Sequence, residues 1–401
     1  MKRRDFLKAT LAGAALATTT GVLPARLFAA TRPNKELQPG TASAWPKLRV
    51  RGSHRGVGEA IGEAFGPTTQ EALKTRAKWF KPLYEFSTSK DGRPIVDEML
   101  AKARLHAGAA VEELEGWAAG AGMEFRQLFV LNCKSEIEAF IDSRCGCAGC
   151  TTVAFADDDG LLVWHNEDGH KAYQGKMFVL DAAVPGVPRA VGLVYPGIMA
   201  GNAPWVNDQG IVMTTNYIPS AKVHAGIPRY FLDRMAMEAR TAEDAIAIVC
   251  HPERAYAFHH IVADLKTRRA WTIEGNPDKI SQREVKGLVL HTNHLRWEGM
   301  KDEPQFEKYI KLSSMPRLAS VTKDLAGIAA PRREDVIKAV STHEGAPYSV
   351  CRHPAKGSSG ATLGAALFEA TKGAPQGAAP FAVEYWKGQP CLGKVATYPV
   401  G

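Results

Sequence analysis

The chain has 401 residues, of which 23% are charged and 45% are hydrophobic, and its formal net charge is +8. These shares lie within the globular range and exclude both a disordered chain and a membrane-embedded helix bundle. The length permits one large α/β domain or two ordinary ones, so the architecture has to be inferred from motifs.

The N-terminus carries the features of an export signal. The run Arg3-Arg4-Asp5-Phe6-Leu7-Lys8 precedes a weakly apolar stretch from Ala9 to Val22, and Phe28-Ala29-Ala30 follows. In this order the features predict a twin-arginine signal peptide over residues 1–30, and hence a protein of the bacterial periplasm. The apolar stretch is short and rich in Ala, Thr and Gly, which argues against a stable membrane anchor.

Charge and cysteine content narrow the range of partners. The signal peptide accounts for half of the net charge of +8, through Lys2, Arg3, Arg4, Lys8 and Arg26 against Asp5. The remaining chain has no block of Lys and Arg interleaved with aromatic residues, so we expect no nucleic-acid partner. Cysteine occurs 7 times, an odd number that leaves at least one thiol free.

Hydrophobic patterning divides the rest of the chain. Residues 31–47 lack apolar periodicity and are rich in Pro, Thr, Ser and Gly, which predicts a linker, with order beginning near Leu48. From Glu59 to Leu131 apolar residues recur at helical spacing, which predicts a helical N-terminal segment. Thr151–Phe155 and Leu161–Trp164 flank an Asp-rich turn, which predicts a β-hairpin.

Further strands and helices are expected after this hairpin. Tyr230–Cys250 predicts a helix broken near Thr241, and Asp335–Val340 predicts a short one. The expected strands are Met177–Val184, Ala190–Tyr195, Ile211–Thr215, His260–Ala263, Ala270–Ile273 and Leu288–His291. One sheet is too small for all of them, so we expect an α+β fold of two packed sheets covered by helices.

Cys150 is the candidate nucleophile. It follows Gly149 and begins the first hairpin strand, so its side chain lies at an accessible strand end. Because Gly149 has no side chain, its carbonyl can twist toward the thiol, which can then attack the peptide bond just before Cys150. An N-to-S shift gives a thioester that water opens. The freed α-amine of Cys150, with a reference pKa of about 7.7, is then a general base beside the thiol.

Other polar residues at strand ends suit the same site. Asp168 ends the second hairpin strand, and the antiparallel return brings it beside Cys150, where it can orient the amine and the thiol. Asn293 follows a later strand and can direct its amide at a developing oxyanion. Asn207 and Asn216 are weaker candidates for this pocket.

Six short motifs follow one another along the chain. They are Gly149-Cys150-Thr151-Thr152, Asn166-Glu167-Asp168, Asn207-Asp208-Gln209-Gly210, His291-Thr292-Asn293-His294, Tyr348-Ser349-Val350-Cys351-Arg352 and Gly360-Ala361-Thr362-Leu363. In this order they resemble the isopenicillin N acyltransferase (acyl-coenzyme A:6-aminopenicillanic acid acyltransferase) family of the N-terminal nucleophile hydrolase superfamily. The resemblance runs from about Leu48 to the C-terminus and includes Glu115-Gly116-Trp117-Ala118-Ala119-Gly120 before the cleavage site.

The resemblance implies an αββα sandwich and a precursor that is cut between Gly149 and Cys150. Residues 48–149 then form an N-terminal α chain and residues 150–401 a catalytic β chain, and the two chains stay associated. It also implies Cys150 as nucleophile, Asp168 as its partner and Asn293 in the oxyanion hole, without any cofactor.

The chain departs from the family pattern at one important position. The family has Ser-Arg before Gly-Ala-Thr-Leu, whereas this chain has Ser358-Ser359, so the active-site arginine of the family is absent there. Ser358 is kept, and Asn166 is kept in its own motif. Arg352 lies a few residues earlier, and the sequence leaves open whether it replaces that arginine or is a structural clamp.

A cysteine cluster and a glycine-rich stretch resemble ligand-binding motifs, but neither is predicted to bind a ligand. A C-x-C-x-x-C cluster lacks a downstream pair of Cys or His at zinc spacing, so we predict no metal at Cys145, Cys147 and Cys150. A glycine-rich stretch resembles a phosphate loop but lacks the following Lys-Ser or Lys-Thr, so we predict a turn and close helix packing at Gly52, Gly56, Gly58 and Gly62.

Histidine and tryptophan residues complete the set of candidates. We expect hydrogen-bonded rather than metal-bound rings at His259, His260, His291 and His294. Trp205 lies near Asn207 and is the best candidate for an acyl-binding surface.

These features predict an amide hydrolase or acyltransferase that acts on small acyl amides such as N-acyl amino acids, peptides or β-lactams. A periplasmic location favours hydrolysis, because coenzyme A thioesters are scarce outside the cytoplasm. The alternative is a noncatalytic periplasmic binding protein that retains the fold, since the family arginine is missing at Ser359. The acyl group, the leaving amine, the assembly state and the disulfide pairing stay open.

Overall fold

The computed structural model describes residues 33–142, 149–373 and 381–400. Residues from Pro33 onward form one compact unit. None of the helices in these ranges is both long and apolar enough to cross a bilayer. The signal peptide predicted at residues 1–30 lies outside the described residues, as do Cys145 and Cys147, so both expectations stay predictions.

Helices precede and follow the central strands. The first group is α1 (His54–Thr75), α2 (Ala77–Thr88), α3 (Gly92–His106), α4 (Gly108–Ala121), α5 (Phe125–Asn132) and α6 (Lys134–Phe140). Later come α7 (Arg229–Ala236), α8 (Ala242–Val249), α9 (Glu307–Tyr309), α10 (Met315–Asp324) and α11 (Arg333–Val340), with the π-helical turn η2 (Ile310–Ser314) between α9 and α10. Two short 3₁₀ turns are η1 (Lys171–Tyr173) and η3 (Pro390–Leu392). The predicted break near Thr241 is confirmed, and the Thr241 hydroxyl accepts the Asp244 N–H at 3.0 Å.

The strands form two sheets. The nine-stranded sheet has the order β1 (Asn34–Gln38), β2 (Lys47–Arg51), β5 (Phe178–Ala183), β6 (Ala190–Val194), β7 (Trp205–Asn207), β8 (Ile211–Tyr217), β9 (Phe258–Asp264), β10 (Arg269–Gly275) and β11 (Ile280–Glu284). The six-stranded sheet has the order β12 (Gly287–His291), β3 (Thr151–Ala156), β4 (Gly160–His170), β13 (Gly360–Thr371), β14 (Phe381–Lys387) and β15 (Val395–Val400). The predicted β3–β4 hairpin is confirmed, with Thr151 opposite Asn166.

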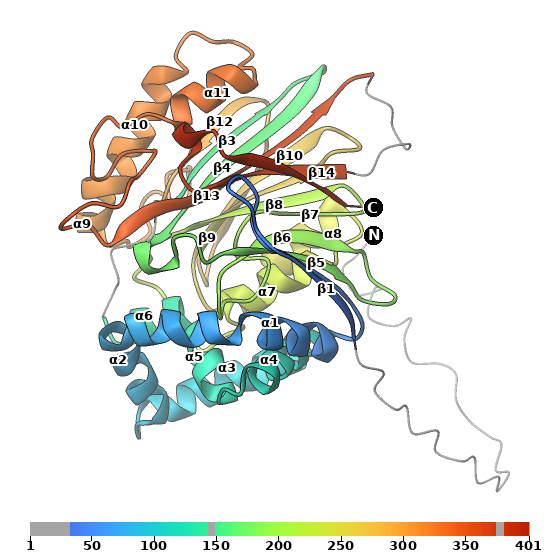
Figure 1. Ribbon diagram of the computed structural model, residues 1–401. Coiled ribbons are helices and arrows are strands. Elements are labelled where there is room, and N and C mark those ends of the chain that lie inside the picture. The colour runs from blue at the N-terminus through green and yellow to red at the C-terminus, as the bar shows by residue number, and fades with distance from the viewer. Residues whose placement is uncertain (1–32, 143–148, 374–380, 401) are drawn as a thin grey trace, which may run out of the picture. The chain divides into compact units, whose positions relative to one another are not determined.

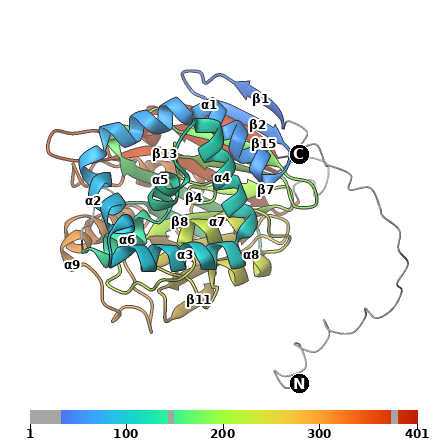
Figure 2. The ribbon, with the colours of Figure 1, turned by 90° about the horizontal axis from the view of Figure 1, so that it is seen from below.

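The sheets and helices stack in four layers, as expected for an αββα sandwich (Figure 1). The two sheets face one another, with β3 against β8 and β10. The first six helices and α7 lie over the outer face of the nine-stranded sheet, where Figure 2 shows them side by side. Helices α10 and α11 cover the six-stranded sheet through a core that includes Val153, Trp164 and Val340. The predicted α+β fold is therefore confirmed.

Regular secondary structure begins earlier in the chain than the sequence predicted. Asn34–Gln38, within the expected linker of residues 31–47, forms strand β1 and pairs with β2. All five side chains of β1 are exposed, so the strand has no buried face to produce an apolar pattern. Trp45 is buried near the end of this segment, and its backbone N–H donates to the Tyr398 hydroxyl at 2.7 Å.

Helices α1 and α4 approach closely because both have glycine at the contact. A Cβ on Gly58 or Gly62 would overlap backbone atoms of α4, and a Cβ on Gly116 or Gly120 would overlap backbone atoms of α1. Close packing rather than phosphate binding therefore accounts for this part of the glycine-rich stretch, as predicted.

This contact provides a stability test. Gly58→Ala is expected to lower the free energy of unfolding by about 3 kcal/mol, because the two helix backbones must separate to admit a methyl group. Gly108→Ala is the matched control, since a Cβ there meets no atom within 4 Å, and it should leave stability unchanged or slightly higher. Urea unfolding of both variants measures the difference. Equal stability of the two would show that the helices can move apart without cost.

Candidate active site

Cys150 lies directly before β3, between the six-stranded sheet and the pocket described below. Its side chain is buried, with 4% of the residue exposed. The sulfur lies 4.0 Å from Glu167 Oε1, and the backbone N–H donates to Asn293 Oδ1 at 2.9 Å. Burial raises the pKa of the Cys150 thiol well above its usual value, and the Glu167 and Asp168 carboxylates raise it further. The thiol therefore needs a nearby base to react.

Asp168 is held at the end of β4 by groups from two other segments. Its Oδ1 accepts the Thr362 hydroxyl at 2.7 Å, and its Oδ2 lies 3.4 Å from Nε of Arg352. Burial raises the pKa of Asp168 to about 6, against the opposing effect of the Arg352 guanidinium. The ion pair is almost fully enclosed, so Arg352 belongs to the site although it does not occupy the position of the family arginine.

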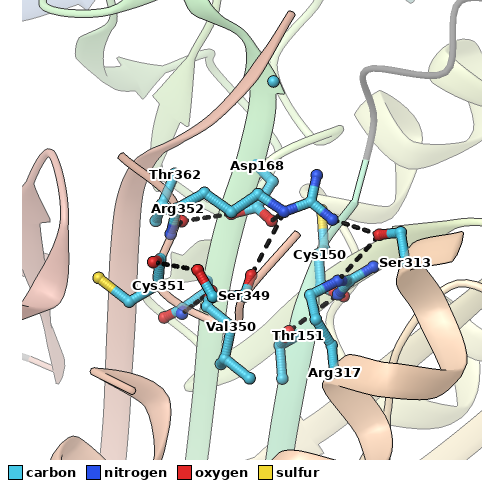
Figure 3. A network of polar contacts seen from close by, with 12 residues as sticks. Cys150, Thr151, Asp168, Ser313, Arg317, Ser349, Val350, Cys351, Arg352 and Thr362 are labelled. Atoms are coloured by element: carbon cyan, nitrogen blue, oxygen red, sulfur yellow. Dashed lines mark hydrogen bonds and ion pairs between the residues drawn. The ribbon is translucent and has the colours of Figure 1, made fainter. Parts of the chain in front are cut away.

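Figure 3 shows two guanidinium groups that meet at the Ser313 hydroxyl. Arg352 Nη2 donates to Ser313 Oγ from one side, and Arg317 Nε donates to it at 3.3 Å from the other. Arg317 also donates to the Cys150 carbonyl at 2.6 Å and to Asn293 Oδ1 at 2.5 Å. Arg317 thus connects the backbone of Cys150 to the side chain of Asn293.

Arg317 is the main site residue that the sequence analysis missed. It lies in the first turn of α10, just after η2, and only 1% of it is exposed. A fully buried arginine is rare unless it is paired. No recognised motif surrounds Arg317 in the sequence. The one feature that could have indicated it is the position of a charged residue on the buried side of a short helix.

Asn293 follows β12 and is fixed on both sides of its amide. Its Oδ1 accepts from Cys150 and Arg317, and its Nδ2 donates to the Tyr217 carbonyl at 2.8 Å. Its backbone N–H donates to the Ser314 hydroxyl at 2.7 Å. The amide has a second N–H for which the described residues supply no further acceptor.

Gly149 lies against the same polar groups. A Cβ built on it would lie 2.9 Å from the Tyr309 hydroxyl and 3.0 Å from Nη2 of both Arg317 and Arg352. The position therefore leaves little space for a side chain, and the peptide bond before Cys150 runs beside two positive charges. Tyr309 Oη is buried and has no hydrogen-bond partner among the described residues.

Glu167 connects the site to a buried polar chain between the sheets. Its Oε1 accepts the Tyr195 hydroxyl at 2.6 Å, and its Oε2 lies 3.1 Å from Nε2 of His165. His165 Nδ1 in turn lies 2.8 Å from the Thr152 hydroxyl. These contacts fix the carboxylate beside the sulfur.

Four other predicted residues do not contact Cys150. Asn166 points to the opposite face of β4 and donates to the carbonyls of Val340 and Val350. Asn207 closes the turn after β7, and the Ser358 hydroxyl bonds to the backbone of Gly360. Asn216 lies nearer the site, where its Oδ1 accepts the Thr152 hydroxyl at 2.8 Å. Asn207 and Ser358 therefore stabilise turns, and Asn216 supports the polar chain.

The four candidate histidines are hydrogen-bonded, as expected. His260 lies 2.9 Å from Asp233, and His291 lies 2.8 Å from Glu274. His259 contacts Asn216 at 2.9 Å, and His294 contacts the Ser314 hydroxyl at 2.7 Å.

A pocket opens beside Cys150. Its aromatic lining comes from Trp79, Tyr173, Tyr195, Tyr217 and Tyr230, and its charged lining from Arg76, Lys134, Glu138, Glu167, Asp168 and Arg229. The prediction that Trp205 forms this wall is wrong, because Trp205 is completely buried in β7 and does not line the pocket.

The sequence profile of the acyl-coenzyme A:6-aminopenicillanic acid acyl-transferase family matches residues 155–376, which is more than half of the chain. The chain belongs to this family. The match begins just after Cys150 and includes Asp168, Asn293, Arg317 and Arg352.

Two curated relatives are similar to this chain. One is the beta-alanyl-dopamine/carcinine hydrolase of Drosophila melanogaster, 28% identical over 224 residues, which cover 51% of this chain and 57% of that protein. The other is the acyl-coenzyme A:6-aminopenicillanic-acid-acyltransferase 40 kDa form of Emericella nidulans, 25% identical over 264 residues, which cover 64% and 71%. The match thus spans little more than half of the hydrolase.

Solved structures include remote matches. A variant of conjugated bile acid hydrolase from Clostridium perfringens is 12% identical with a TM-score of 0.37, over 63% of this chain and 97% of that one. Penicillin V acylase from Agrobacterium tumefaciens is 10% identical with a TM-score of 0.37, over 59% and 82%.

Proposed function

We propose that this protein is an autoproteolytic amide hydrolase or acyltransferase with Cys150 as its N-terminal nucleophile. The observation that supports this most directly is the position of Cys150. Its sulfur lines the pocket beside two carboxylates, while its own backbone nitrogen is held by Asn293 at 2.9 Å. An amine released at that nitrogen would stay on the same residue as the thiol.

In the first step, the Cys150 sulfur attacks the carbonyl carbon of Gly149. The peptide C–N bond breaks, and the Cys150 nitrogen takes up a proton and becomes a free amine. Water then opens the resulting thioester to give a Gly149 carboxylate and restores the thiol. Arg317 and Arg352 lie beside Gly149 and would stabilise the negative charge that develops on its carbonyl oxygen.

In turnover, the free amine of Cys150 accepts the thiol proton, and the thiolate attacks the acyl carbonyl of the substrate. The available N–H of Asn293 donates to the oxyanion, and the leaving amine takes the proton from the Cys150 amine. Water, or a second amine, then releases the acyl group from sulfur. Asn293 Oδ1 and Arg317 keep the amine in position during both steps.

The pocket favours small acyl amides that carry a charged group. Its walls combine aromatic rings with the charged groups of Lys134, Arg229 and Glu167. A long hydrocarbon chain in the pocket would remove water from these charges without replacing its hydrogen bonds. N-acyl amino acids, aminoacyl amides and β-lactams have the required polarity. If the predicted signal peptide directs the chain to the periplasm, water is the expected acceptor.

Mass analysis of the mature protein tests the proposal. Two associated fragments are expected, the second beginning with Cys150 and able to hydrolyse some members of a panel of acyl amides. Each charged amide is paired with a neutral amide of the same size, which should react more slowly. A single intact chain without activity would favour a noncatalytic binding protein instead.

The ion pair of Asp168 predicts how self-cleavage depends on pH. Because its pKa is raised to about 6, Asp168 is ionised above pH 6 and holds Arg352 beside Gly149. Below pH 6 the carboxyl is protonated and this ion pair is lost. The rate at which refolded precursor is cut should therefore rise with pH, with a midpoint near 6.

Precursor isolated in denaturant and refolded at several pH values supplies this measurement. Asp168→Asn should cut slowly at every pH, while Asp158→Asn, on the exposed turn between β3 and β4, should keep the parent profile. A rate that does not change across pH 6 would contradict the role given to Asp168.

A further inference from the structure

Four side chains of the types that bind metal ions lie together near the surface, away from Cys150. His343 lies in the loop after α11, Cys351 and His353 flank Arg352, and Cys391 lies in η3. One ligand atom from each of the four lies within 4.8 Å of all the others. We propose that these residues form a zinc site.

The distances match the edges of a zinc tetrahedron. Zinc binds nitrogen at about 2.0–2.1 Å and sulfur at about 2.3 Å, which puts neighbouring ligand atoms about 3.3–3.8 Å apart. His353 Nε2 lies 3.2 Å from His343 Nε2 and 3.2 Å from Cys391 Sγ. The other pairs lie within 4.8 Å, so small side-chain rotations would complete the tetrahedron.

The chemistry of the four groups also suits zinc. Two cysteines and two histidines form one of the usual structural zinc sites. When the two thiols each lose a proton to solvent, two thiolates and two neutral imidazoles balance the charge of the ion. Cys351 and Cys391 are both free thiols, and His343, His353 and Cys391 are exposed, so the ion has a path from solvent.

The proposed ion would join three segments that are far apart in the sequence. These are the loop after α11, the segment Cys351–His353 and η3. The same segments already touch, since Cys351 N–H donates to the Thr342 carbonyl at 3.0 Å and Gln389 donates to the Arg352 carbonyl at 3.2 Å. Zinc would therefore fix the backbone of Arg352, whose side chain extends inward to Asp168. The site does not depend on the proposed function.

Metal analysis of the full-length purified protein tests the proposal. About one zinc ion per chain is expected after dialysis against metal-free buffer. Cys391→Ser and His353→Gln should each retain less than about a tenth of this metal. Both positions are exposed, so the variants should fold, and circular dichroism checks this. Cys250→Ser and His224→Gln, which replace a cysteine and a histidine elsewhere, should keep the full amount.

Two further measurements separate zinc from the alternatives. Addition of Co²⁺ to the metal-free protein should give the visible absorption of tetrahedral thiolate coordination, and Cys391→Ser should abolish it. Alkylation and mass analysis without reductant should find both Cys351 and Cys391 as thiols once the metal is removed. A Cys351–Cys391 disulfide in the native protein would overturn the proposal. So would reduced protein that binds neither Zn²⁺ nor Co²⁺.

Discussion

Cys150→Ala is expected to leave the chain uncut and to lower amide turnover by at least about a thousandfold. The methyl group can attack neither the Gly149 carbonyl nor a substrate, and without cleavage the α-amine stays in a peptide bond. The two losses therefore occur together. Intact mass gives the first result and hydrolysis of a responsive acyl amide gives the second.

Two companion variants make this result specific. Cys250→Ala removes a half-buried thiol at the end of α8 and should process and turn over like the parent. Cys150→Ser keeps a nucleophile of similar size and should cut itself slowly. If Cys150→Ala were processed and active, another nucleophile would be needed and the proposed mechanism would be wrong.

Short sequence patterns predicted those elements of the fold that depend on residues close together in the sequence. The β3–β4 hairpin and the helix break near Thr241 depend on residues close in sequence, and both are confirmed. Strand β13 (Gly360–Thr371) was not predicted as a strand, because Gly and Ala fill much of it and have low strand propensity. Its pairing along the whole length of β4 provides the stability that its sequence lacks.

The same holds for the candidate active site. Residues close in sequence were predicted, whereas several residues brought together only by tertiary packing were missed. Cys150 directly precedes β3 and Asp168 lies near the end of β4, so the β3–β4 hairpin brings them together. Arg317 and the aromatic pocket wall come from helices and turns whose packing the sequence does not display. The proposed zinc ligands have no short-range spacing that would indicate a metal site, because His343 and Cys391 meet only through the fold.

Arg317→Met is expected to lower kcat by about a hundredfold and to slow self-cleavage, with a smaller change in KM. Burial and the nearby Arg352 lower the pKa of Arg317 to about 10, so it is still protonated at neutral pH. Methionine fills a similar volume but leaves the Cys150 carbonyl and Asn293 Oδ1 without their strongest donor. Asn293 could then rotate, and both the amine and the oxyanion donor would lose their positions.

Arg317→Lys distinguishes this positioning role from a general structural one. A lysine keeps the charge but offers a single donor centre, so it should restore part of kcat without restoring both contacts. Arg332→Met, at a position where 83% of the side chain is exposed, is the control and should behave like the parent. Urea unfolding of each variant measures stability separately. If Arg317→Met lost stability while the folded fraction kept full kcat, Arg317 would hold α10 in place and have no role in positioning Cys150.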